Sequence, residues 1–264
     1  MTSRLRWALA DAGVVTGRDL THWVRQPAPI VISLLFPVLV ALMFGYLFGG
    51  ALSVPGGGSY REFLLPGIFA MAMVFGLEVT MVAVATDAAR GVTDRFRSLP
   101  MAPSAVVTGR SLADLLNGVA GLTILGLSGL AVGWQPRNGL GAALAAVGLL
   151  LLLRFALTWV GIWLGLVVKG PEAVAGVQIL VWPLGFLSSA FVAPETMPGW
   201  LGAIAAWNPL SSTVAATREL FGNPGWGGDT WIAQHAILMA IAWPLLLTAV
   251  FLPLSVRRYR RLRR

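Results

Sequence analysis

Residues 63–104 read FLLPGIFAMAMVFGLEVTMVAVAT and then DAARGVTDRFRSLPMAPS, so a long apolar run passes directly into a charged island. The run Phe63–Thr86 is long enough to cross the roughly 30 Å hydrocarbon core of a bilayer as one helix. Charges are costly inside lipid, so the island that follows is expected to face water. The alternation of such runs with short polar connections predicts an all-α, polytopic membrane protein.

The composition of the whole chain fits this class. Apolar residues make up 57% and charged residues 11% of the 264 residues, whereas soluble domains carry about 25% charged residues. We interpret the chain as one transmembrane domain, 1–264, with an amphipathic interfacial helix at 1–27, spans within 28–254 and a basic tail at 255–264. Six runs are predicted to span the membrane: Ala28–Phe48, Phe63–Thr86, Leu115–Val132, Leu140–Val168, Ala173–Val192 and Trp231–Leu254.

The positive charges predict the orientation. Six spans place both termini on one side, and most of the 19 Lys and Arg residues fall on that side. Positive residues gather in cytoplasmic loops, so both termini are predicted to be cytoplasmic, in the cell membrane of a bacterium. The net charge of +8 is then an orientation signal that needs no nucleic acid. The Arg-rich tail is expected to contact anionic lipid headgroups.

The first 27 residues carry two apolar faces. Leu5 and Leu9 share one, Leu20 and Trp23 share another, and arginines flank both. A basic amphipathic helix with Trp commonly lies in the membrane interface. A mobile basic tail is the alternative.

The island itself has helical periodicity. Val92, Phe96 and Leu99 recur on one face, and Pro100 and Pro103 are expected to stop the helix. A short helix with an apolar stripe suits a groove in another protein. The alternative is a solvated loop whose Phe96 rests on the membrane surface.

The segment before the last span is long and apolar. Pro198–Trp207 and Leu210–Phe221 have helical patterns but are too short to span. Asn208-Pro209 fits an N-cap followed by proline at the first helical position. We predict two re-entrant half-helices, with a flat surface hairpin as the alternative. The candidate residues of this segment are Pro198, Trp200, Asn208, Pro209 and Arg218, and Trp200, Trp207, Trp226 and Trp231 are placed at the outer headgroup level.

Two ionisable residues, Glu78 and Arg154, fall inside predicted spans. Such residues usually face the protein interior or a wet cavity. Both residues are predicted to lie within the membrane, at different distances from the cytoplasmic end of their spans. A long Arg side chain could close that gap and reach Glu78 if the two helices touch. We expect either a polar point on a transport route or gate, or a structural ion pair or snorkelling.

The sequence offers no catalytic apparatus. There is no G-x-x-x-x-G-K-[ST] phosphate loop, since the sole lysine, Lys169, follows Val168. His22 and His235 lie at opposite ends of the predicted topology, so no metal site is expected. We predict that the chain is not an enzyme and that any ATP hydrolysis belongs to a separate polypeptide.

Three blocks of the sequence resemble the permease subunits of type-2 ABC exporters, most nearly their daunorubicin-resistance (drug-exporting) branch. They are Leu65-Pro66-Gly67, the island 87–101 with Arg110 after it, and residues 194–220. The leading segment Arg18…Arg25-Gln26-Pro27 with Phe36-Pro37 is similar too, and the resemblance covers almost the whole chain in the right order. In one departure, Asp87-Ala88-Ala89-Arg90 lacks the acidic residue that relatives often carry soon after the Asp.

The resemblance implies an interface helix before span one, a coupling helix between spans two and three, and re-entrant helices before span six. It also implies a homodimer that works with two copies of an ATP-binding subunit. ATP and Mg²⁺ would bind to that partner, and no cofactor to this chain. The residues that it assigns to ATPase coupling are Asp87, Arg90, Gly91, Asp94, Arg95, Phe96, Arg97, Leu99 and Pro100.

The expected cargo is an amphiphilic or hydrophobic compound, such as a drug, an antibiotic or a lipid. A polysaccharide or glycolipid exporter of the same fold is the first alternative. An ATP-independent secondary transporter and a non-transporting membrane scaffold are the others. Secondary transporters usually show internal repeats, and none is visible in this sequence.

Overall fold

The computed structural model describes residues 11, 13–18, 21, 25, 28–47, 59–91, 103–168, 170–225 and 230–261. Within these ranges all regular structure is helical, which confirms the predicted all-α class. The elements are α2 (Ala28–Leu47), α3 (Tyr60–Ala89), α5 (Pro103–Val132), α6 (Gly139–Val167), α7 (Pro171–Phe186), a 3₁₀ turn η1 (Pro194–Thr196), α8 (Gly199–Trp207), α9 (Pro209–Phe221), α10 (Trp231–Gln234) and α11 (Ala236–Arg261).

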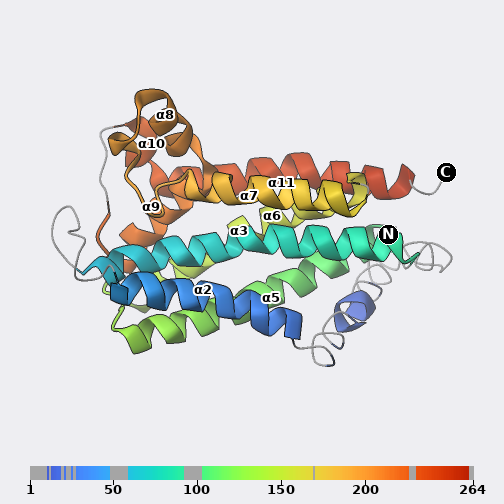
Figure 1. The fold of residues 1–264 in the computed structure, drawn as a ribbon, viewed down its shortest axis with the longest axis horizontal. Helices are drawn as coiled ribbons and strands as arrows, with labels where there is room; N and C mark the ends of the chain where they lie inside the picture. The colour runs from blue at the N-terminus through green and yellow to red at the C-terminus, as the bar shows by residue number, and fades with distance from the viewer. Residues whose placement is uncertain are drawn as a thin grey trace.

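The long helices run side by side along the long axis of the molecule, and the short helices α8 and α10 gather at one end of it (Figure 1). The basic C-terminal end of α11 lies at the opposite end, together with the end of α3 and the start of α5. The described residues 13–18 near the N-terminus are helical, and Thr16 Oγ1 donates to the Gly109 carbonyl of α5 at 2.9 Å.

Four helices are long and apolar enough to cross a membrane: Tyr60–Ala89, Val107–Val132, Gly139–Val167 and Ala236–Arg261. The described residues also include two shorter apolar stretches, Leu35–Leu47 in α2 and Glu172–Phe186 in α7. Four of the six predicted spans therefore have the required length, and the count of six is not confirmed.

The structure differs from the predicted boundaries of the last two spans. The fifth run was expected to reach Val192, but α7 ends at Phe186, so its 16 residues cover only about 24 Å. The Ser188 hydroxyl donates to the Gly185 carbonyl and competes with continuation of the helix. The last run breaks at His235 into α10 and α11, and α11 then continues to Arg261, well into the predicted tail.

The centre of the bundle is the contact between α3 and α6. Two glycines on α6 allow the backbones to approach closely. A Cβ atom at Gly161 would lie 2.7 Å from the Leu77 carbonyl oxygen, and one at Gly165 would lie 2.7 Å from that of Met81. Small residues four apart are a common device for close helix packing in membranes. Trp159, two residues before Gly161, and Ile162 between the two glycines are both buried in the core beside this contact.

The end that carries α8 and α10 is held by the loop between α5 and α6. Trp134 Nε1 donates to Asn223 Oδ1 at 2.7 Å, just beyond α9. The backbone N–H of Arg137 donates to the Phe221 carbonyl at 2.7 Å, and the Arg137 side chain pairs with Glu62 on α3. Helix α9 is thereby fixed against α3, α6 and α11 rather than lying loosely on the surface.

Candidate functional site

A buried ion pair lies between α5 and α6. Arg154 on α6 donates through Nε and Nη2 to the two carboxylate oxygens of Asp114 on α5, at 2.7 and 2.6 Å. Both side chains are more than nine-tenths buried. Bidentate pairs of this kind are strong and directional because both oxygens meet parallel N–H groups.

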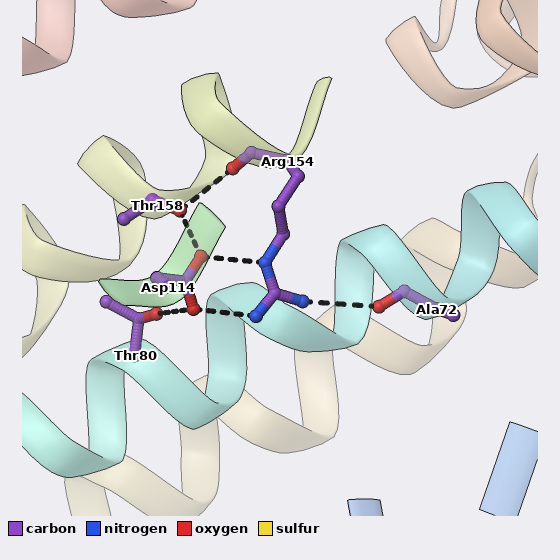
Figure 2. Close-up of polar contacts among 5 residues, drawn as sticks. All are labelled: Ala72, Thr80, Asp114, Arg154 and Thr158. Carbon is purple, nitrogen blue, oxygen red and sulfur yellow. Dashed lines mark hydrogen bonds and ion pairs between the residues drawn. The ribbon is translucent and has the colours of Figure 1, made fainter. Parts of the chain in front are cut away.

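Hydroxyl groups complete the coordination of the carboxylate (Figure 2). Thr80 on α3 donates to Asp114 Oδ1 at 2.9 Å, and Thr158 on α6 donates to Oδ2. The Thr158 hydroxyl also lies 2.9 Å from the Arg154 carbonyl oxygen. The four side chains tie α3, α5 and α6 together at one point, and we call them the Asp114–Arg154 cluster.

Two glycines make room for this cluster. A Cβ atom at Gly76 on α3 would lie 1.6 Å from Arg154 Nη1, which is physically impossible, and one at Gly118 on α5 would lie 3.2 Å from Arg154 Cγ. The guanidinium therefore crosses α3 where that helix has no side chain. Only glycine at residue 76 is compatible with the observed arginine position.

The structure corrects the expected partner of Arg154. No ion pair joins Glu78 to Arg154, both of which are described, because Asp114 occupies the guanidinium. Sequence reasoning missed Asp114 because it began the third span at Leu115, whereas α5 starts at Pro103. Pro103, interpreted as a stop, instead occupies the first position of a new helix, where proline is favoured. That preference was the signal that would have placed Asp114 inside a helix.

Glu78 lies one turn along α3 from Phe75. Its Oε1 atom is buried and has no hydrogen-bond partner in the described part of the chain. Phe75 packs against Trp182 of α7, with ring centroids 4.8 Å apart, and against Phe36 of α2 at 5.9 Å. Trp182 and Phe36 lie at 5.4 Å from each other and both remain partly exposed. An aromatic surface of this kind suits a flat, cationic amphiphile, which can stack on the rings.

The island between α3 and α5 is described only at its edge. Asp87 pairs with Arg110 at 2.6 Å, which joins the end of α3 to the start of α5. Arg90 forms the C-cap of α3, and Gly91 has a left-handed φ of 68°. The other predicted coupling residues lie outside the described residues: Asp94, Arg95, Phe96, Arg97, Leu99 and Pro100.

The helix boundaries predicted before the last span are confirmed. Pro198 is the N-cap of α8, and Pro209 is the first residue of α9. Asn208 Oδ1 accepts from Leu210 N at 2.9 Å, and Asn208 Nδ2 donates to the Leu184 and Leu187 carbonyls. Trp200 is 69% exposed. The same asparagine therefore caps α9 and ties it to the end of α7.

Arg218 differs from its expected setting. The sequence places it on the second of the two outer half-helices, but in the structure it is only 2% exposed. Its guanidinium donates to the carbonyls of Phe63, Ser189 and Ala190 at 2.8–3.0 Å and lies over the Phe63 ring. The helix pattern of α9 placed Arg218 on a helix but gave no sign that this helix is packed on several sides.

A bundle of apolar helices that buries an ion pair between them is the architecture of a multi-pass membrane transport protein. The profile of the ABC-2 type transporter family matches residues 11–221. The chain belongs to this family, and the resemblance inferred from sequence is confirmed.

Individual relatives of the chain are likewise named as transport permeases. The chain is 37% identical, over 92% of its length and 83% of the relative, to the daunorubicin resistance ABC transporter permease protein DrrB1 of Streptomyces coeruleorubidus. It is 22% identical, over 96% of its length and 90% of the relative, to the probable doxorubicin resistance ABC transporter permease protein DrrC of Mycobacterium tuberculosis. It is 25% identical, over 86% of its length and 82% of the relative, to the putative transport permease ycf38 of Pyropia yezoensis.

Proposed function

We propose that this chain is the permease subunit of an ATP-driven exporter that moves amphiphilic aromatic compounds out across the bacterial cytoplasmic membrane. The observation that carries the proposal is the near full-length similarity to a daunorubicin resistance permease. The aromatic surface formed by Phe36, Phe75 and Trp182 supports this class of cargo.

The proposed topology has six crossings, by α2, α3, α5, α6, α7 and α11, with both termini in the cytoplasm. The arginines at the end of α11 and the Asp87–Arg110 pair lie at one end of the bundle, and α8 and α10 lie at the other, which favours this orientation. Helices α8 and α9 are then re-entrant from outside. The short α7 meets α8 and α9 through Asn208, so protein atoms satisfy backbone carbonyls where α7 stops.

The proposed coupling to ATP runs through the island. A separate ATP-binding subunit would contact residues 92–102, and the Asp87–Arg110 pair would transmit the movement to α3 and α5 together. The Asp114–Arg154 cluster then joins these two helices to α6. We place this chain in a homodimer bound to two such ATP-binding subunits, with ATP and Mg²⁺ on those subunits.

The test is reconstitution with the candidate ATP-binding subunit in inside-out vesicles. We expect ATP-dependent uptake of a fluorescent, planar amphiphilic cation, and no ATP hydrolysis by this chain alone. Phe75→Ala should raise the half-maximal cargo concentration at least tenfold, because an aromatic anchor typically contributes ~2 kcal/mol. Leu127→Ala, at an exposed position of α5, is the matched control and should change nothing. Uptake without ATP, or ATP hydrolysis by the isolated chain, would contradict the proposal.

A further inference from the structure

A cavity of about 360 Å³ lies at the end of the molecule that carries the short helices. Its wall is built by η1, α8, α9, α10 and the first turn of α11. Figure 1 shows α8, α9 and α10 gathered at one end of the molecule. The volume is in the range that proteins use for small ligands. The transport mechanism outlined above makes no use of this cavity.

Arg218 contributes to the wall, and no anionic side chain of the described residues pairs with it. Its guanidinium is met by three carbonyl dipoles. Two of its five N–H groups have no partner in that part of the chain. A buried charge without a counter-ion is costly. The site is therefore short of one anion.

Ser212 supplies a second, independent indication. Ser212 lines the cavity on α9, one helical turn before Ala215, which also lines it. Ser212 is only 3% exposed. Its Oγ is buried and forms no hydrogen bond to any described residue. A buried hydroxyl without a partner loses its hydration and gains nothing in return. An oxygen of a bound anion would satisfy it.

The remaining charges of the wall have the opposite sign. Glu195 and Glu219 are both exposed in the cavity wall, where they favour a cationic group. The cavity thus presents a buried guanidinium and hydroxyl together with two solvent-accessible carboxylates. This arrangement matches a zwitterion whose anionic end is deep and whose cationic end faces outward.

We propose that this cavity binds a phosphate–ammonium zwitterion, with the phosphate at Arg218 and Ser212 and the ammonium at Glu195 and Glu219. Two sources share this chemistry: an ethanolamine phospholipid of the outer leaflet and a soluble phosphoethanolamine. Trp200, Trp207 and Trp231 are more than half exposed near the cavity, as expected of side chains at headgroup depth. The outer-leaflet source rests on the proposed topology, whereas binding of the zwitterion does not.

The experiment is native mass spectrometry of the purified full-length chain. It is titrated with dioctanoyl phosphatidylethanolamine, dioctanoyl phosphatidylglycerol and soluble phosphoethanolamine. We expect the ethanolamine lipid to bind at least tenfold more tightly than the glycerol lipid. Ser212→Ala should weaken it about tenfold, the effect of losing one hydrogen bond to a charged group. Because this hydroxyl has no partner among the described residues, the same variant should not lower the melting temperature.

Cavity filling gives a matched pair of variants on α8. Ala206→Leu enters the cavity and should abolish lipid binding, whereas Ala203→Leu is exposed on the same helix and should not affect it. Glu219→Gln should reduce the preference for ethanolamine over glycerol lipid. Equally tight binding of soluble phosphoethanolamine would support the site and assign it to a soluble ligand. Equal binding of both lipids, unchanged in Ser212→Ala and Ala206→Leu, would overturn the proposal whether or not the chain transports drugs.

Discussion

Removing one member of the Asp114–Arg154 pair should destabilise the protein far more than removing both. In Asp114→Leu the Arg154 guanidinium stays buried without a counter-ion, and breaking a buried pair in this way costs about 3–5 kcal/mol. Arg154→Met leaves the carboxylate with only the Thr80 and Thr158 hydroxyls. For a chain of this size that loss lowers the melting temperature by roughly 6–20 °C.

The double variant, Asp114→Leu with Arg154→Met, should recover most of this loss. No buried charge remains, and Thr158 keeps its contact with the carbonyl of residue 154. Only the Thr80 hydroxyl loses its acceptor, at about 1–3 kcal/mol. The assay is thermal unfolding of the four proteins in one detergent, at matched purity. A double variant as unstable as the sum of its single variants would refute the view that the two charges act as a pair.

Three further predictions address other contacts. Gly165→Ala should lower the melting temperature, because its Cβ would lie 2.7 Å from a carbonyl oxygen of α3, at a cost of about 1–3 kcal/mol; Gly148→Ala, in open space on the same helix, is the control and should be neutral or better. Asp87→Arg should uncouple ATP hydrolysis from cargo uptake, and the charge swap with Arg110→Asp should restore coupling; an unrescued swap would show that the pair itself is not what matters. Cysteines introduced along α8 and α9 of this cysteine-free chain should react with a membrane-impermeant reagent from outside only, and less at buried positions of α9; uniform labelling would indicate a solvated surface hairpin.

Local signals predicted the ends of short helices well. Asn208-Pro209 marks the start of α9, and Gly222, with a left-handed φ of 68°, marks its end. Capping and proline placement depend on a few neighbouring residues, so one sequence suffices to predict them. The preference of proline for the first helical position likewise fits Pro103 at the start of α5.

Features that depend on packing were not predictable. Arg218 falls in a predicted short outer helix, yet its guanidinium is buried and donates to carbonyls of α3 and of the segment that follows α7. The true partner of Arg154 lies 40 residues away in the sequence, on another helix. Hydropathy reports which residues avoid water, but it carries no information on which helices touch. The Asp114–Arg154 pairing therefore emerged only from the three-dimensional arrangement.

The absence of a side chain at Gly76 has a mechanical consequence. Arg154 passes through that gap and is held there by Asp114, while Gly161 and Gly165 bring the same two helices into backbone contact. A movement of α3 that brought Phe75 or Leu77 to the position of Gly76 would drive a side chain into the guanidinium. We therefore expect helices α3, α5 and α6 to move together during a transport cycle. Alternating access then has to arise where these three helices contact α2, α7 or a second subunit. Conformational probes placed at those contacts are expected to report the motion.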